Sequence, residues 1–209
     1  MEKIGGELKT KEGRFSTKKG IIVRKILHLT TVLAPIYYIS GSKASLIRVL
    51  FPLTGLFIIA EAARLYIKPV RQIFLRIFGP MLWKDEERGF TAAMRWFIAA
   101  SIVCGYFPKE IAILTLFFVA ISDTAAYTVG LWFGRREIVK GKTIGGTLTF
   151  LVTAIMIAVF SPLPKIISIP GAVIATLVEL IPRYDDNLSI PIITGIVLWI
   201  MTWAIGVPE

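Results

Sequence analysis

Asp123 is the residue whose type and position most strongly indicate chemistry in this sequence. It stands just after the apolar run Ile111–Ile121. A carboxylate in an apolar, membrane-spanning segment is costly, so such a residue is by default a candidate for function. A carboxylate also suits Mg²⁺, which binds few protein carboxylates and completes its octahedron with water and phosphate oxygens. Asp123 is therefore predicted to bind a divalent metal ion beside a phosphorylated ligand.

A glycine-spaced basic loop follows, and it is predicted to hold the phosphates of that ligand. Its candidate residues are Arg135, Arg136, Lys140, Gly141, Lys142, Thr143, Gly145 and Gly146. Glycines let backbone N–H groups approach phosphate oxygens, and a helix beginning near Thr143 would direct its positive end toward them. The loop is not a P-loop, because Arg136 stands where that motif needs glycine and no preceding strand is expected. The alternative is a loop that only sets membrane topology, which would require neither the glycines nor Lys142.

A second group of acidic residues lies near the C-terminus. It consists of Glu179, Asp185 and Asp186, followed by Asn187. Taken alone, the group is typical of a polar turn in which Asn187 or Ser189 caps the next helix. Because it falls on the same predicted side of the membrane as Asp123, it can also supply further carboxylates for a divalent metal ion.

Other polar residues near predicted helix ends are expected to support and orient such a site: Arg24, Lys25, His28, Glu61, Arg64 and Glu87. Arg24 and His28 are four residues apart and share one helix face. His28 is the only histidine, so orientation or phosphate contact is favoured over a metal site or general base. Glu61 and Arg64 can form a helix-end ion pair, while Glu87 precedes a predicted helix, where negative charge is favourable.

The composition indicates the kind of fold that must position these residues. The 209-residue chain is 55% hydrophobic, and its mean hydropathy of +0.71 is too high for an ordinary soluble domain. We therefore expect an all-α integral membrane protein, because helices satisfy their backbone polar groups internally. The single cysteine, Cys104, excludes an intrachain disulfide and a cysteine-rich metal site. Residues 1–20 are polar and do not resemble a cleaved signal peptide; they are expected to be cytoplasmic, with 21–209 forming one transmembrane domain.

The hydropathy pattern predicts seven membrane-spanning helices. They are expected at about 26–40, 44–61, 91–107, 110–133, 144–160, 166–181 and 189–206. The first and sixth of these segments are shorter than a straight span requires. Residues 65–83 alternate apolar and basic positions at helical spacing, which indicates an amphipathic helix in the membrane interface.

The distribution of positive charge predicts the orientation of these helices. With a cytoplasmic N-terminus, only Lys43, Arg48, Lys109 and Lys165 of the 24 lysines and arginines would be external. This places the C-terminus outside and the basic loop after Asp123 in the cytoplasm, where nucleotides are found. The net charge of +10 therefore reflects topology, and no nucleic-acid partner is expected.

Five motif blocks, taken in order, resemble those of the CTP-dependent lipid-alcohol kinases, a family that includes dolichol kinase, phytol kinase and the CTP-using diacylglycerol kinase. The blocks are Arg24–His28, Glu61–Arg64, Glu87–Thr91, Ser122–Ala126 continuing through Gly134–Arg136 to Lys142–Gly146, and Glu179 with Asp185–Pro191. The resemblance extends over residues 20–195. One departure is Gly145, where the family more often carries glutamate.

The resemblance implies transfer of the γ-phosphate of CTP to the hydroxyl of a membrane lipid alcohol, giving a lipid phosphate and CDP. Polyprenol or dolichol is the first expected acceptor, followed by phytol or geranylgeraniol and diacylglycerol. Asp123 and Lys142 would be catalytic. Mg²⁺ would be held by Asp123 with Asp185, Asp186 or Glu179, and the basic loop would neutralise charge on the phosphates. The acceptor would arrive from the bilayer with its tail in a groove between helices. Asp123 or one of the pair Asp185 and Asp186 would accept the hydroxyl proton, and the resemblance is compatible with a homo-oligomer.

Two alternatives come from other classes of protein. Phosphatidate cytidylyltransferases are membrane enzymes that use CTP and carry a similar Asp…Gly-Arg…Lys-Thr block, but this sequence lacks their terminal Asp-Arg-x-Asp signature. A small membrane transporter would also place an acid in the membrane. It would not explain a glycine-spaced basic loop on the same side as Asp185–Asn187.

Overall fold

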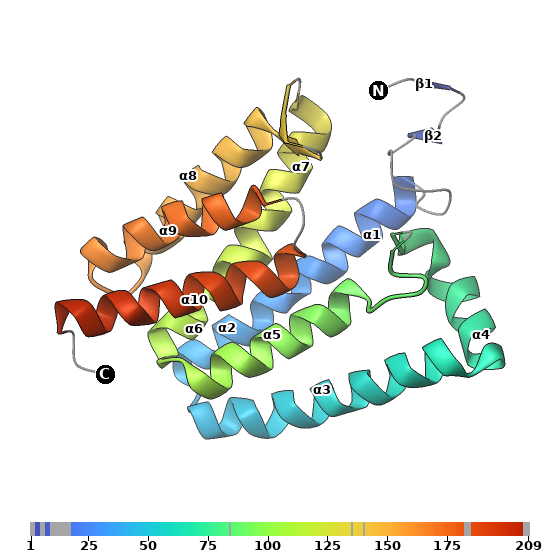
Figure 1. Cartoon of the computed structure of the whole chain (residues 1–209), viewed down its shortest axis with the longest axis horizontal. Coiled ribbons are helices and arrows are strands. Elements are labelled where there is room, and N and C mark those ends of the chain that lie inside the picture. The colour runs from blue at the N-terminus through green and yellow to red at the C-terminus, as the bar shows by residue number, and fades with distance from the viewer. Residues whose placement is uncertain are drawn as a thin grey trace.

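The computed structural model describes residues 3–4, 7–8, 18–83, 85–134, 136–139, 141–181 and 185–206. This part of the chain is predominantly helical, as predicted, and its long helices form an antiparallel bundle (Figure 1). The helices are α1 Lys18–Leu29, α2 Leu33–Ser40, α3 Lys43–Tyr66, α4 Lys68–Phe78, α5 Ala92–Tyr106, α6 Lys109–Phe117, α7 Asp123–Phe133, α8 Ile144–Phe160, α9 Lys165–Glu179 and α10 Asp186–Ile205. Two short antiparallel hairpins accompany them: β1 Lys3–Ile4 with β2 Glu7–Leu8, and β3 Glu137–Val139 with β4 Lys142–Thr143.

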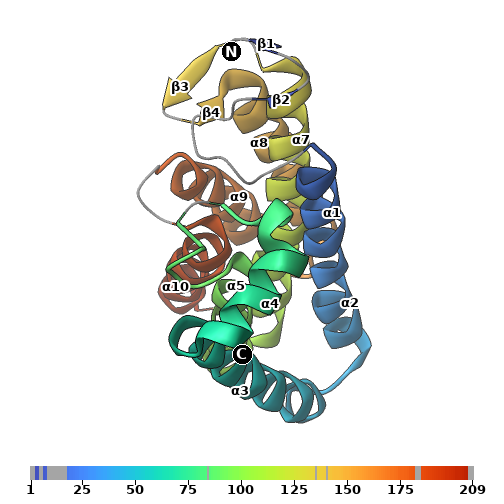
Figure 2. The same ribbon diagram turned by 90° about the vertical axis from the view of Figure 1, so that its right-hand side faces the viewer.

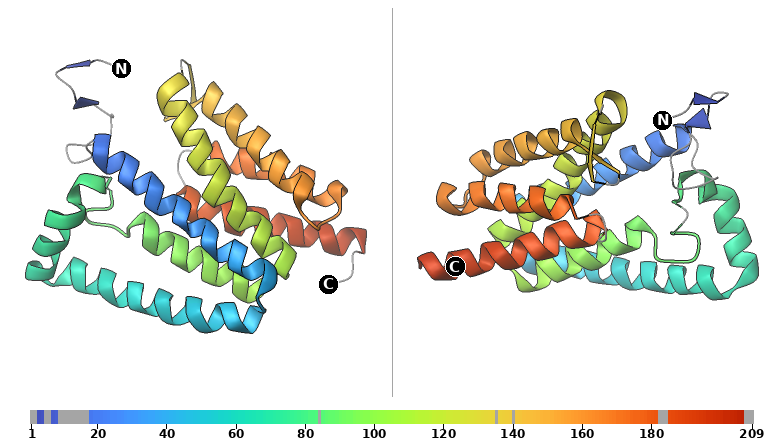
Figure 3. Two further views of the ribbon diagram at one scale, coloured as in Figure 1. Left: turned by 180° about the vertical axis from the view of Figure 1, so that it is seen from behind. Right: turned by 45° about the horizontal axis from the view of Figure 1, so that its top comes forward.

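Two pairs of helices are joined into longer rods. A 3₁₀ turn, Thr30–Val32, connects α1 to α2, and a π-helical segment, Phe118–Ser122, connects α6 to α7. The two rods lie side by side, as the view from behind shows (Figure 3). The α6–α7 rod forms much of the core, and Ile111, Leu114 and Phe118 on it are almost fully buried. Asp123 is buried at the start of α7, whereas Trp132 and Phe133 at the end of that helix are exposed.

Each of the seven predicted segments is occupied by a helix, but their lengths differ. Four helical stretches are long and apolar enough to cross a membrane: Gly20–Ser40, Lys43–Tyr66, Lys109–Phe133 and Asp186–Ile205. Ala92–Tyr106 and Ile144–Phe160 are apolar but shorter, and α9 has 15 residues. The structure supports a multi-pass helical membrane protein, and its first span begins earlier than hydropathy predicted.

The predicted amphipathic helix is present but shorter than expected, as α4. Pro69 stands in its first turn, and a 3₁₀ turn, Gly79–Met81, follows its end. No residue of α4 is buried. Phe74 and Phe78 nevertheless line the same cavity as the predicted site residues, while Ile73 is 62% exposed. The helix thus has an inner and an outer apolar edge.

The bundle brings the helix ends that carry most of the predicted site residues to one side. The starts of α1, α5, α8 and α10 and the ends of α3, α7 and α9 lie on the same side, together with α4 and the β3–β4 hairpin (Figures 1 and 2). The C-terminal end of α10 lies at the opposite side. This antiparallel arrangement brings segments far apart in sequence to one polar end.

Close packing of α7 on α8 fixes the basic loop beside the Asp123 helix. A Cβ atom on Gly130 would lie 3.0 Å from Thr143 Oγ1, and one on Gly146 would lie 2.9 Å from the Ala126 carbonyl oxygen. Small residues are therefore required where the two backbones approach. Ala126, Gly130 and Gly134 recur every four residues along α7, and this row of small residues allows the packing that holds Lys142 near the end of the bundle.

Candidate functional site

A cavity of about 2210 Å³ opens at the polar end of the bundle. Among the predicted site residues it is lined by Arg24, Lys25, His28, Glu61, Arg64, Asp123, Gly141, Lys142, Thr143, Gly146, Glu179, Asp185, Asp186 and Asn187. Its other side is apolar and is formed by α2 and α3, with residues such as Leu33, Tyr37, Leu50 and Phe57. Sites for a single small ligand usually measure about 300–1,000 Å³. One cavity therefore has room for a polar and an apolar ligand.

Lys142 is the centre of the polar part of this cavity. Its Nζ atom lies 2.6 Å from Glu179 Oε1 and 2.6 Å from Asp186 Oδ2. Burial by itself lowers the pKa of the ammonium group, but the negative charges around it, above all that of Asp186, outweigh this effect and raise the pKa above its ordinary value. The basic loop and the C-terminal acids, predicted separately, meet at this lysine.

Local sequence explains how Lys142 reaches this position. Gly141 has a φ of +82°, a left-handed conformation that favours glycine, and it forms the turn between β3 and β4. Thr143 then caps α8, since its side chain accepts a hydrogen bond from the Gly146 N–H. Helix α8 therefore begins directly after Lys142, and its positive end lies at the cavity.

Asp123 is buried at the junction of α1 and α7. Its Oδ2 atom lies 3.1 Å from Lys25 Nζ and 3.6 Å from His28 Nε2. His28 Nε2 also lies 2.9 Å from the carbonyl oxygen of Val119, in the π-helical segment, and must donate because a carbonyl only accepts. Such π-helical turns frequently occur at functional sites. Sequence analysis favoured a role for His28 in orientation or phosphate contact over one as a general base, and this geometry is compatible with a role in orientation.

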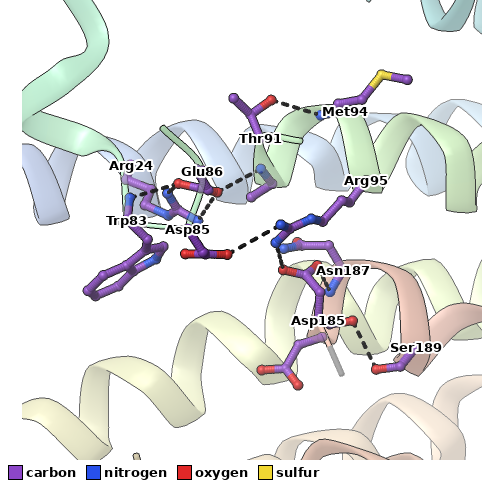
Figure 4. Close-up of polar contacts among 12 residues, drawn as sticks. Arg24, Trp83, Asp85, Glu86, Thr91, Met94, Arg95, Asp185, Asn187 and Ser189 are labelled. Atoms are coloured by element: carbon purple, nitrogen blue, oxygen red, sulfur yellow. Dashed lines mark hydrogen bonds and ion pairs between the residues drawn. The ribbon is translucent and has the colours of Figure 1, made fainter. Parts of the chain in front are cut away.

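A second set of contacts fixes the start of α10. Asp185 is its N-cap, and its Oδ1 atom accepts a hydrogen bond from the Asn187 N–H at 3.1 Å. Its Oδ2 atom lies 2.6 Å from Arg95 Nη1, and Arg95 Nη2 lies 3.3 Å from Asp85 Oδ2 (Figure 4). Arg95 therefore joins the start of α10 to the segment that precedes α5. Asp185 has this capping role, so it does not pair with Lys142 as Asp186 does.

Glu61 and Arg64 form a buried ion pair that connects two segments. Arg64 Nε donates to Glu61 Oε2 at 2.7 Å, and its guanidinium also donates to the carbonyl oxygens of Glu86, Glu87 and Gly89. Glu61 in turn accepts from the Thr91 N–H at 3.0 Å. The helix-end ion pair predicted from sequence is present, and it holds the segment before α5 against α3.

Glu86, rather than the predicted Glu87, is the buried acid of that segment. It is 1% exposed and forms an ion pair with Arg24 across the cavity wall. It also accepts hydrogen bonds from the N–H groups of Trp83 and Ala92 (Figure 4). The sequence signal for Glu87 was its position before a predicted helix. Glu86 shares this position, so the signal could not distinguish the two residues.

The acids beside Lys142 retain oxygen atoms suited to a hard cation. Among the described residues, Glu179 Oε2, Asp186 Oδ1 and Asn187 Oδ1 are buried and have no hydrogen-bond partner. Carboxylate and amide oxygens are ligands that suit Mg²⁺, which keeps several positions for water and phosphate. No group of three acidic, histidine or cysteine side chains in the described chain could hold a metal ion alone. These atoms thus fit a Mg²⁺ ion shared with a phosphorylated ligand, not one enclosed by protein.

Some predicted residues do not join the cavity. Arg136 is exposed, and Arg136, Gly145 and Glu87 are absent from the cavity lining. Arg135 and Lys140 lie outside the described residues. In contrast, Asp85, Glu86 and Arg95 line it and were not predicted as site residues. The contacts of these three residues depend on which segments meet in the fold. No spacing pattern along the chain predicts such contacts.

The fold and cavity define a helical membrane protein with a charged site at one end of the bundle and an apolar recess beside it. Comparison with known proteins adds the family. CTP-dependent diacylglycerol kinase 1 of Saccharomyces cerevisiae is 26% identical over 217 residues, which cover 88% of this chain and 74% of the relative. The enzyme of the same name from Schizosaccharomyces pombe is 26% identical over 151 residues, covering 62% and 69%. These distant homologues support membership in the family of CTP-dependent lipid kinases, as the motif blocks predicted.

A further relative has no assigned activity. It is an uncharacterized protein of Rickettsia prowazekii, 28% identical over 200 residues that cover 88% of this chain and 94% of that protein. No protein-family model matches the chain, and no solved structure matches it significantly. The family assignment therefore depends on the homologues and the motif blocks together.

Proposed function

We propose that the protein is a CTP-dependent kinase that transfers the γ-phosphate of CTP to the hydroxyl group of a membrane lipid alcohol. The observation that carries this proposal is the single cavity with two chemically different parts. The Lys142 cluster and Asp123 line its polar part, and the apolar side chains of α2 and α3 line the rest. A phosphate donor and a lipid acceptor could meet there without the lipid leaving the bilayer.

The polar part would position and neutralise the nucleotide phosphates. Phosphoryl transfer depends mainly on positioning and on stabilising charge, so a fixed ammonium group and a helix N-terminus are suitable. Lys142, held by Glu179 and Asp186, would lie against the transferred phosphate. Glu179, Asp186 and Asn187 would hold a Mg²⁺ ion, which would supply positive charge to offset that of the phosphates.

Asp123 would act on the acceptor hydroxyl. Its carboxylate lies beside Lys25 and His28 on α1, and Leu27 on α1 and Thr31 in the following 3₁₀ turn add to the cavity wall that continues to α2. A carboxylate so placed can orient a lipid hydroxyl and accept its proton, as an aspartate does in protein kinases. Lys25 and His28 would hold the carboxylate in position.

The acceptor lipid is the finer part of the proposal. The motif blocks favour polyprenol or dolichol, whereas the named homologues are diacylglycerol kinases. The apolar wall runs along α3 from Leu46 to Phe57, about 17 Å at the rise of an α-helix. That length can hold part of a hydrocarbon tail of either kind, so we propose both classes as substrates to be compared.

The test is a labelled-nucleotide assay with purified protein, Mg²⁺ and a panel of polyprenol, phytol and diacylglycerol, with phosphatidate added as the substrate of a cytidylyltransferase. Label from γ-labelled CTP is expected to appear in at least one lipid. If γ-label reaches no lipid while α-labelled CTP labels phosphatidate, the protein is a cytidylyltransferase and the kinase proposal is wrong. Omission of Mg²⁺ with a chelator is expected to abolish transfer.

A further inference from the structure

Two aromatic rings from distant segments meet at the wall of the polar part of the cavity. Trp83 precedes α5, and Tyr127 lies on α7, one helical turn after Asp123. Their ring centroids are 6.5 Å apart and their planes are inclined at 66°. Both rings line the cavity and both residues are partly buried. They form a corner of aromatic surface that opens to the site.

Each ring also carries a cation from α1. The Arg24 guanidinium lies 5.5 Å from the centroid of Trp83, and Lys25 Nζ lies 4.2 Å from the centroid of Tyr127. The same Lys25 Nζ atom lies 3.1 Å from Asp123 Oδ2. The aromatic corner is therefore one side chain away from the candidate catalytic carboxylate, and positive charge lies between them.

Trp83 is held in place at its backbone and not by core packing. The backbone N–H of Trp83 donates to Glu86 Oε2 at 2.9 Å, and Glu86 forms an ion pair with Arg24 (Figure 4). The backbone that carries the ring is therefore fixed by this ion pair. Trp96 and Trp132 lie near the two extremes of tryptophan exposure in this chain. Trp96 is 5% exposed in the core, whereas Trp132 is 71% exposed on the outer surface of α7. Trp83 fits neither pattern, because it borders a charged cavity.

We propose that Trp83 and Tyr127 form the binding site for the nucleobase of CTP. This inference rests on the proposed function, since it assumes a nucleotide whose phosphates reach Lys142. A planar pyrimidine can stack on one ring and meet the second ring at its edge. Stacking on aromatic side chains tolerates every base, because each base has a π-face. The corner would therefore contribute affinity for a nucleotide without discriminating strongly between CTP and UTP.

The experiment compares Trp83→Leu and Trp83→Phe with the wild-type protein in the labelled-CTP assay. Loss of the ring is expected to raise KM for CTP roughly 5- to 100-fold, the range of affinity lost with one base-stacking contact. KM for the lipid alcohol is expected to stay unchanged, and Trp83→Phe should keep most of the affinity. Trp132→Leu is the matched control on the outer surface of α7 and should leave both constants unchanged.

A binding measurement without lipid separates this proposal from the proposed function. Cytidine monophosphate is expected to quench tryptophan fluorescence of the wild-type protein, and the quench should disappear in Trp83→Phe although the protein elutes normally in size-exclusion chromatography. If the quench is present but no lipid is phosphorylated, the nucleobase site stands and the kinase proposal fails. If transfer occurs and Trp83→Leu leaves KM for CTP unchanged, or raises only KM for the lipid, the nucleobase site is overturned.

Discussion

Lys142 stands where two acids from different helices converge, and its charge determines how they can be held together. Without the ammonium group, Glu179 and Asp186 would face each other as buried like charges. That arrangement is costly in a low-dielectric environment. The same lysine is the cation best placed to contact a transferred phosphate. A structural role and the proposed catalytic role therefore coincide at this residue, and a test must distinguish them.

Lys142→Met is expected to lower kcat by about 100-fold or more, in the range lost with one preorganised group that stabilises developing charge. The measurement is γ-label transfer from CTP to the preferred lipid. Lys165→Met provides a matched control, because Lys165 begins α9 at the opposite end from Glu179 and is exposed. A Lys142→Met protein that elutes normally but retains wild-type kcat would remove Lys142 from the mechanism.

The raised pKa of Lys142 makes a separate prediction about pH. A cation whose pKa is higher in the folded state stabilises the fold fully below its unfolded pKa, and this contribution is lost as pH rises through the folded value. With an ordinary lysine pKa of about 10.4, the stabilisation by Lys142 should be constant from pH about 7 to about 10. The difference in thermal stability between wild type and Lys142→Met in detergent should therefore not fall across this range. A difference that disappears near pH 8 would contradict the ion cluster.

Asp123→Asn preserves the shape of the side chain and removes the charge that faces Lys25 and His28. We expect transfer to fall by about 100-fold or more, because both charge complementarity and proton acceptance are lost. Glu110→Gln is the control, since Glu110 lies in the first turn of α6 at the other end of the same rod. Wild-type turnover in Asp123→Asn would exclude the carboxylate from the reaction.

At the scale of helices and loops, Arg95 connects two segments that carry the site. Arg95→Met is expected to lower kcat about fivefold, because it releases the Asp185 cap and the Asp186 that follows it, a cap being worth about 1 kcal/mol. Asp85→Asn should have little effect, since the Asp85 side chain is 66% exposed and its contact with Arg95 is longer. Turnover and Mg²⁺ dependence of the two variants provide the comparison. Equal losses would show that the acidic segment before α5 matters as much as the α10 cap.

The sequence predicted which segments form helices better than it predicted the residue at which each helix begins. Hydropathy began the first span at residue 26, because Arg24 and Lys25 lower the local average. In the structure these residues belong to α1 and face a polar cavity, so the helix continues where the hydropathy signal ends. A residue-by-residue scale cannot register a polar interior.

The part of the site that one short sequence motif contains could be predicted from the sequence. Lys142, Thr143 and Gly146 follow each other closely, and their local geometry depends on the Gly141 turn and the α8 cap. Arg95 and Glu86 could not be identified in this way, because their partners are Asp185 and Arg24, dozens of residues away. Such contacts come from the antiparallel order of the bundle, which spacing along the chain does not reveal.

At the scale of the whole molecule, the antiparallel bundle separates two ends of different character. The predicted site residues Lys142, Glu179 and Asp186 line the cavity at the end that holds the starts of α8 and α10, whereas His28 and Asp123 line it further in, midway along the α1–α2 and α6–α7 rods. The bends between α2 and α3, and between α8 and α9, lie at the other end. If that end is external, as the charge distribution predicts, CTP would reach the cavity from the cytoplasm and the acceptor from the bilayer.

The shortest helices provide the most direct test of the predicted seven spans. Helix α9 has 15 residues, about 22 Å at the rise of an α-helix, against a hydrocarbon core of about 30 Å. Helices α8 and α9 are antiparallel neighbours, so the C-terminus lies on the same side whether both cross the membrane or neither does. Only the bend between them distinguishes the two cases.

With the buried Cys104 replaced by serine, a cysteine at Lys165 should react with an impermeant maleimide on intact cells. A cysteine at the exposed Arg136 should react only after permeabilisation. Labelling of both positions only after permeabilisation would mean that the α8–α9 pair does not reach the outer surface, and that five helices cross the membrane.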